Sequence, residues 1–259
     1  MTPADASIEL WLIDLTCCAP ALEALERDTP RLSDDDRERA RTIRDPIRRR
    51  QRLAAYAALR VLIERVAGPR VRRRPLVRSP GGKPGLGGAQ FSLSHTEGFA
   101  LIGLTARLPI GVDVERTRSL KLSQRRQEEI CAVGAGLGGK RAADVEADHA
   151  IIQAWVRLEA FAKACGRGLG QTLADLGLRE RRHRLMPCAQ LEAAARNLAR
   201  DAGLTVSDVR LPCGLHGAVA VGVGAPLPHP SLFPADRESV ERLLAQPWRG
   251  PGVDSGSCP

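Results

Sequence analysis

The chain has 259 residues, of which 43% are hydrophobic and 27% are charged. This composition supports a packed core and excludes an intrinsically disordered chain, and the absence of any apolar stretch of about 18 residues excludes a membrane-spanning helix. The net charge of +9 indicates an anionic partner, although lysine is rare and arginine abundant, so part of the basic excess reflects a compositional bias.

Cysteines, histidines and the amino-terminal residues exclude further classes of protein. The seven cysteines include no CxxC pair and the five histidines are scattered, so neither a zinc site nor a disulfide framework is predicted. The first residues lack the basic segment followed by an apolar one that a secretion signal needs. We therefore expect a cytoplasmic protein that does not associate with a membrane.

The sequence starts with a short apolar segment at 8–14, which predicts a strand. Residues 33–67 then follow a helical pattern that begins at Ser33, a favourable N-cap residue with three aspartates after it. Pro46 is expected to divide this pattern, so that a second helix runs over about 48–66.

A glycine- and proline-rich loop covers residues 80–88. After it, β-branched and aromatic residues bounded by turn residues predict three short strands, at 90–94, 99–105 and 110–115.

The second half of the sequence contains the clearest helical pattern, at 148–165, which ends at two glycines. A second helix is predicted at 189–201 and a strand at 217–223. From residue 224 onward proline and glycine become frequent, with one predicted helix at 236–245, and we expect this tail to be poorly packed.

Helix, glycine-rich loop and apolar strand thus occur twice, at 48–105 and at 148–223. This order predicts an α+β fold of two similar, pseudo-symmetric halves. We place the halves at 1–110 and 111–224, with the Pro/Gly-rich tail at 225–259.

Two carboxylates are predicted on one face of the strand at 110–115. Asp113 and Glu115 are two residues apart, so both point to the same side of a strand while Val112 and Val114 point to the core. Paired carboxylate oxygens suit Mg²⁺. The alternative is a solvated strand face that binds nothing.

A second group lies along one stripe of the helix at 148–165. Trp155, Glu159 and Lys163 are spaced by four residues, with the glutamate before the lysine, which is the favourable order for an ion pair. The alternative is an ordinary surface salt bridge.

A third group follows the glycine-rich loop. Lys83 and Pro84 stand among glycines that let the backbone approach a phosphate, and Ser94 and His95 supply hydrogen-bond donors near the end of the next strand. The alternative is a solvated lysine and an unremarkable strand end.

The order of these motifs is more specific than any one of them. GGKPG, FSLSHT, IGVDVE and WVRLEAFAKACGRGL together resemble the Sfp-type 4′-phosphopantetheinyl transferases, chiefly over residues 33–170. The resemblance implies two similar α+β halves with the active site in the cleft between them. It also implies transfer of the 4′-phosphopantetheine arm of coenzyme A to a serine of an apo acyl or peptidyl carrier protein, with release of adenosine 3′,5′-bisphosphate.

The resemblance also assigns roles to residues. Mg²⁺ would be held against the pyrophosphate of coenzyme A by Asp113, Glu115 and Glu159, and Glu159 would act as the base for the carrier serine. Lys163 would stabilise or protonate the departing phosphate, with His95 as a further catalytic group. Coenzyme A would be contacted by Lys83, Pro84, Ser94, His95, Asp113, Lys163 and, near the nucleotide, Arg52.

Three positions depart from the family pattern. Leu158 stands where the family usually has lysine, Tyr56 where many members have arginine, and Ser92 where asparagine is frequent. We expect an active enzyme that binds coenzyme A phosphates more weakly than usual.

The chain contains both halves, so a monomer is expected, with coenzyme A and an acidic carrier protein as partners and no nucleic acid. The glycine-containing stretch 117–147 is predicted to be a mobile segment over the carrier site. Two alternatives remain: the arginine-dense stretch 37–78 as a nucleic-acid-binding face, and a catalytically weakened family member that only binds carrier proteins.

Overall fold

The structure is a computed structural model that describes residues 8–79, 81–86, 89–138, 147–178, 186–246 and 248. It combines helices and strands, as the α+β prediction required. The chain forms two compact units. Unit 1 consists of Met1–Val77, Pro84–Leu108 and Pro226–Pro259, and unit 2 of Arg78–Lys83 and Pro109–Ala225.

Unit 1 contains a four-stranded sheet in the order β4-β5-β1-β9. β4 (Gln90–Thr96) and β1 (Ile8–Asp14) both pair antiparallel with β5 (Phe99–Thr105), and β9 (Ser231–Leu232) pairs parallel with β1. The predicted strands at 8–14, 90–94 and 99–105 are therefore confirmed. Two further short strands, β2 and β3, form a separate ladder; they span Val77–Arg78 and Pro84–Gly85.

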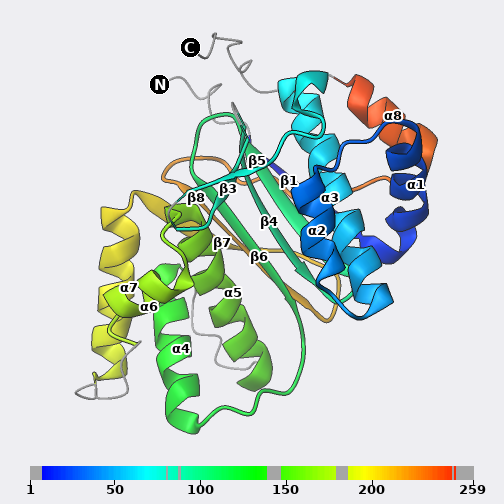
Figure 1. The fold of residues 1–259 in the computed structure, drawn as a ribbon. Coiled ribbons are helices and arrows are strands. Elements are labelled where there is room, and N and C mark those ends of the chain that lie inside the picture. The colour runs from blue at the N-terminus through cyan, green and yellow to red at the C-terminus, as the bar shows by residue number, and fades with distance from the viewer. Residues whose placement is uncertain are drawn as a thin grey trace. The chain divides into compact units, whose positions relative to one another are not determined.

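Four α-helices accompany this sheet, and Figure 1 shows them gathered to one side of its strands. They are α1 (Leu15–Asp28), α2 (Asp34–Arg41), α3 (Pro46–Ala67) and α8 (Arg237–Ala245), and a short 3₁₀ helix at Pro69–Val71 follows α3. Every residue of α3 from Ala54 to Glu64 is buried, so this helix forms the centre of the core of unit 1.

Local chemistry explains why the 33–67 pattern forms two helices, as predicted. The Ser33 hydroxyl accepts from the backbone N–H of Asp36, and the Asp36 carboxylate accepts from the N–H of Ser33, which closes a capping box. Pro46 occupies the first position of α3, where its missing N–H costs nothing. Gly68, at a φ of 78°, ends α3.

The prediction of a poorly packed tail is wrong for the part of the tail that the structure describes. Phe233 and Val240 are 5% and 1% exposed, and both belong to the core of unit 1. The backbone N–H of Phe233 donates to the carbonyl of Leu12 at 2.9 Å. Because α8 places its apolar residues on one stripe, this Pro/Gly-rich tail still buries an apolar helix face.

Unit 2 contains a three-stranded antiparallel sheet in the order β6-β8-β7. The strands are β6 (Ile110–Arg116), β8 (Leu215–Gly222) and β7 (Leu204–Val209). The strands predicted at 110–115 and 217–223 are confirmed within one or two residues.

The helices of unit 2 are α4 (Gln124–Leu137), α5 (Ala147–Cys165), α6 (Leu169–Asp175) and α7 (Cys188–Asp201). α5 packs on the sheet, against both β6 and β8, while α4 packs against α5 and α7. The helices predicted at 148–165 and 189–201 are therefore confirmed, and α5 carries two of the predicted site residues.

The prediction of a mobile segment at 117–147 is wrong for residues 124–137, which form α4. An ideal Cβ on Gly134 would lie 2.4 Å from the Cβ of Ala154 in α5, and one on Gly136 would lie 2.2 Å from the carbonyl oxygen of Glu192 in α7. These glycines therefore allow three helices to approach closely. Residues 139–146 lie outside the described residues.

A similar close approach joins β6 to α5. An ideal Cβ on Gly111 would lie 2.0 Å from the carbonyl oxygen of Ala160 and 2.4 Å from the backbone nitrogen of Ala164. We expect Gly111→Ala to force α5 away from the sheet and to lower the free energy of unfolding by about 1–3 kcal/mol. Urea unfolding measures this, with Gly170→Ala, where a Cβ meets nothing, as the control. Equal stabilities of the two variants would contradict the packing argument.

In the described part of the chain, no helix combines the length and the apolar character needed to cross a bilayer.

Candidate functional site

The two strand carboxylates lie on the face of β6 that α5 covers. Gly111, which touches α5, has the same parity along the strand as Asp113 and Glu115, so all three share that face. Asp113 is only 3% exposed, and Val112 and Val114 are buried on the other side. Asp113 is therefore not part of a solvated strand face.

Lys163 joins the strand carboxylate to the helix carboxylate. Its ammonium donates to Asp113 Oδ1 at 2.6 Å and lies 3.6 Å from Glu159 Oε2. The two carboxylate oxygens are thus no farther apart than the sum of these distances. Segments fifty residues apart in the chain, β6 and α5, meet at this one ammonium.

The alternative of an ordinary surface salt bridge fits this arrangement poorly. The side chains of Glu159 and Lys163 are 26% and 30% exposed, and their third partner is a buried aspartate. A buried carboxylate is stable as an anion only with a cation or several hydrogen bonds beside it. Lys163 supplies that cation to Asp113, so the three side chains form one partly buried ion-pair cluster.

Glu115 is the third predicted metal ligand. It lies at the half-buried end of β6, where its Oε2 accepts from Arg118 at 2.7 Å. Among the residues that the structure describes, no three Asp, Glu, His or Cys side chains are gathered as a metal site requires. The three predicted ligands are all carboxylates, the donor type that suits Mg²⁺, and two of them, Asp113 and Glu159, lie beside the same ammonium.

Lys83 also belongs to unit 2, and its side chain reaches the first residue of β6. Its ammonium donates to the backbone carbonyl of Ile110 at 2.9 Å, and burial lowers the pKa of this lysine. The backbone of Gly81 packs directly on that of Gly166, where an added Cβ would lie 1.8 Å from the carbonyl oxygen. The two glycine-rich motifs, GGKPG and CGRGL, thus pack on each other.

The other predicted contacts of coenzyme A belong to unit 1. Ser94 is buried in β4, and the half-buried His95 pairs with Ala100 of β5. Pro84 begins β3. The guanidinium of Arg52 lies 5.7 Å from the ring centre of Tyr56 and donates to its hydroxyl at 3.3 Å.

The position that departs from the family pattern in α5 is explained by packing. Leu158 is fully buried among the apolar side chains of unit 2, so a lysine at this position would bury an ammonium. The basic residue just before Leu158 in the chain, Arg157, does not take over the role of the family lysine. It makes a bidentate pair with Asp208 of β7, at 2.7 and 2.6 Å, on a different side of α5 from Lys163.

Sequence reasoning did not identify His216, which lies directly opposite Glu115 in the β6–β8 ladder. Its ring contacts Gln153 of α5 and Thr117, and burial, followed by the neighbouring His149, lowers its pKa. Only the strand register places this histidine beside Glu115, since the two residues are about a hundred positions apart in the chain.

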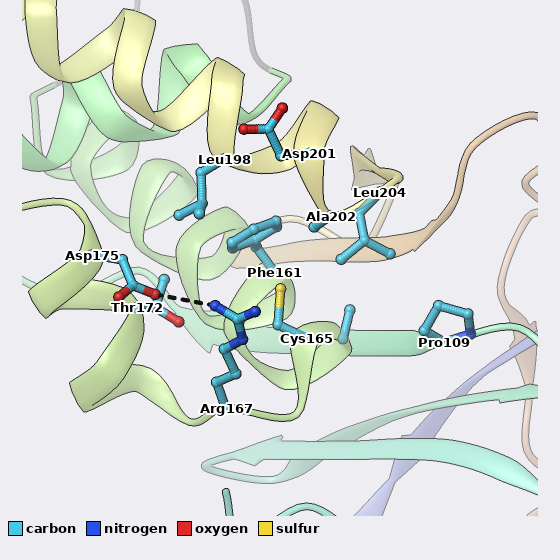
Figure 2. Close-up of a pocket in the computed structure, with 11 residues that line it drawn as sticks. Pro109, Phe161, Cys165, Arg167, Thr172, Asp175, Leu198, Asp201, Ala202 and Leu204 are labelled. Carbon is cyan, nitrogen blue, oxygen red and sulfur yellow. Dashed lines mark ion pairs between the residues drawn. The ribbon is translucent and has the colours of Figure 1, made fainter.

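Unit 2 also contains a pocket of about 360 Å³, shown in Figure 2. Phe161, Leu198 and Leu204 form its apolar wall, and Arg167 and Asp175 form an ion pair at 3.7 Å on its polar side. Asp113, Glu159 and Lys163 are not among its lining residues. The pocket is therefore separate from the carboxylate cluster.

No family model matches the chain. Over 162 residues the chain is 28% identical to a protein of Synechocystis sp. named "Putative 4'-phosphopantetheinyl transferase". The match covers 57% of this chain and 63% of that protein, so the chain spans less than two thirds of the relative. The relative supports the resemblance seen in the motifs.

Proposed function

We propose that the chain is a 4′-phosphopantetheinyl transferase, which moves the phosphopantetheine arm of coenzyme A to a serine of an apo carrier protein and releases adenosine 3′,5′-bisphosphate. The observation that carries the proposal is the ammonium of Lys163 between Asp113 and Glu159, on residues that match two separate family motifs. The name of the Synechocystis relative supports the same reaction class.

We assign the binding of Mg²⁺ to Asp113, Glu115 and Glu159. The bound ion would neutralise the charge that develops on the pyrophosphate. Glu159, at the edge of the cluster, accepts the proton of the carrier serine, directly or through a water. Lys163, which donates to Asp113 and forms an ion pair with Glu159, would donate to the departing phosphate.

The phosphates of coenzyme A are assigned to Lys83, Ser94 and His95, with Pro84 and Arg52 as further contacts. To reach a phosphate, Lys83 exchanges the carbonyl of Ile110 for a charged oxygen. This exchange is favourable because an ammonium gains more from an anion than from a neutral carbonyl.

The alternative of a nucleic-acid-binding protein has less support. Several arginines of the stretch 37–78 are engaged in ion pairs within unit 1, namely Arg50 with Glu23, Arg60 with Asp36, Arg65 with Glu9 and Arg72 with Glu64. The net charge of +9 suits an acidic carrier protein, because opposite charges speed association.

The proposal is tested by incubating the protein with coenzyme A, Mg²⁺ and an apo acyl carrier protein and weighing the carrier by intact-mass spectrometry. We expect a mass gain of one phosphopantetheine group that disappears when EDTA removes the metal. Carrier binding without a mass gain would indicate the weakened family member. Salt-sensitive retention of nucleic acid, with neither carrier binding nor mass gain, would contradict the proposal.

A further inference from the structure

A chain of hydrogen bonds connects α5 to the end of β6 through His216. Gln153 of α5 donates from Nε2 to Asp208 Oδ1 at 2.8 Å and to the carbonyl of Gly217 at 3.1 Å. Its Oε1 lies 3.3 Å from His216 Nδ1. The other ring nitrogen of His216, Nε2, lies 3.1 Å from the hydroxyl of Thr117.

The chemistry of these partners fixes the direction of every bond. Asp208 and the Gly217 carbonyl are both acceptors, so the amide nitrogen of Gln153 must face them and uses both of its hydrogens. Its oxygen can only accept, and Nδ1 of His216 therefore carries a hydrogen. In the neutral ring Nε2 is then an acceptor, and Thr117 is the donor.

One end of this chain is anchored. Asp208 accepts the two hydrogen bonds of the buried Arg157, which like Gln153 belongs to α5. Asp208 and Asp113 are both paired with Ala218, so the two aspartates stand in one row on the face that α5 covers. α5 is thus held to the sheet by Lys163 on one flank and by Arg157 on the other.

The other end of the chain is next to the third carboxylate. Thr117 follows β6 by one residue, and its backbone N–H donates to the carbonyl of Gly214 at 2.9 Å. Glu115 is two residues before Thr117, and directly opposed residues of an antiparallel pair lie on the same face of the sheet, so Glu115 and His216 are side by side. The hydrogen bond from Thr117 to His216 therefore ties down the chain directly after β6, two residues beyond Glu115.

We propose that His216 is a positioning residue: it orients the end of β6, through Thr117, and so sets where the Glu115 carboxylate lies relative to Asp113 for a bound divalent ion. The inference rests on the proposed function, because it assigns His216 to the support of the same metal ligands. Groups that orient metal ligands typically contribute about tenfold or more to metal affinity.

The test measures Mn²⁺ binding to the full-length protein by calorimetry. Thr117→Val removes the hydroxyl, and His216→Asn keeps the donor toward Gln153 but removes the acceptor for Thr117. Because each change deletes the same hydrogen bond, we expect each to weaken Mn²⁺ binding by about tenfold and the double variant to weaken it no further. Thr205→Val, at an exposed position of β7, is the control, and we expect it to bind Mn²⁺ with the affinity of the wild type.

Two further readouts separate positioning from a general loss of structure. Thermal unfolding of each variant shows whether it is folded, and the mild Thr117→Val change keeps the test usable if His216→Asn does not fold. The nitrogen spectrum of the imidazole rings in the wild type should show His216 with its proton on Nδ1. Unchanged Mn²⁺ affinity in a folded Thr117→Val variant, with transfer intact in the wild type, overturns the inference alone. A wild type that neither binds Mn²⁺ nor transfers phosphopantetheine overturns the proposed function and the inference together.

Discussion

Asp113→Asn is expected to lower the rate of phosphopantetheine transfer by about three orders of magnitude. The substitution keeps the shape of the side chain and removes its charge, and one favourable charge interaction at about 4 Å contributes roughly 4 kcal/mol at an effective dielectric constant near 20. Asp113 is buried and accepts a hydrogen bond from Lys163, so both the proposed metal binding and the position of that ammonium depend on its charge. Initial rates with saturating carrier protein measure the effect.

Asp175→Asn is the matched control for this prediction. Asp175 is also an aspartate of unit 2 that pairs with a cation, Arg167, but it lies in α6, away from the carboxylate cluster. We expect the transfer rate of Asp175→Asn to stay within about twofold of the wild-type rate. If Asp113→Asn retains the wild-type rate while remaining folded, Asp113 is not a ligand of the catalytic metal.

Arg60→Met is expected to lower the free energy of unfolding by about 3–5 kcal/mol, which corresponds to a fall of roughly 10 °C in Tm. Arg60 is 2% exposed, and its guanidinium contacts Asp36 at 2.5 Å, the Ser33 hydroxyl at 3.1 Å and the carbonyl of Arg74 at 2.6 Å. Methionine fills similar volume but leaves the Asp36 carboxylate buried without its cation.

The double variant Arg60→Met/Asp36→Leu provides the control. Removing both charges leaves no buried carboxylate, so we expect it to recover a large part of the lost stability, although the capping box of α2 is also lost. Guanidinium chloride unfolding monitored by circular dichroism measures both variants. An Arg60→Met protein as stable as the wild type would show that the ion pair contributes nothing to the fold.

Local patterns in the sequence predicted much of the secondary structure correctly. Ser33 and Pro46 fixed where α2 and α3 begin, because capping and the missing proline N–H act within a few residues. The alternation in β6 put Asp113 and Glu115 on one face for the same reason. By contrast, the sequence did not predict α1, which contains Pro20. A proline inside a helix removes a backbone hydrogen bond and usually indicates that the helix ends there.

Glycine was the residue that local reasoning misread most. In the sequence, Gly134 and Gly136 helped to predict a mobile segment. In the fold they are the points where α4 touches α5 and α7. The sequence shows that a glycine has no side chain, but it does not show which other helix packs against its backbone. The tail was misread in a similar way: the helix predicted at 236–245 is present as α8, but the proline and glycine around it led to an expectation of poor packing, whereas α8 packs its apolar side chains into the core of unit 1.

The sequence by itself therefore predicted the longer strands of unit 1, the strands β6 and β8 of unit 2 and several of the helices, and it identified the carboxylates, lysines and loop residues whose motifs resemble one enzyme family. Only the tertiary structure decided that Lys163 lies between Asp113 and Glu159, that Arg157 is committed to Asp208, and that His216 stands beside Glu115. The physical reason is the range of the interactions. Helix and strand preferences depend on neighbours within a few residues, but these contacts depend on strand register and on how α5 lies across the sheet, which no local stretch of the chain specifies.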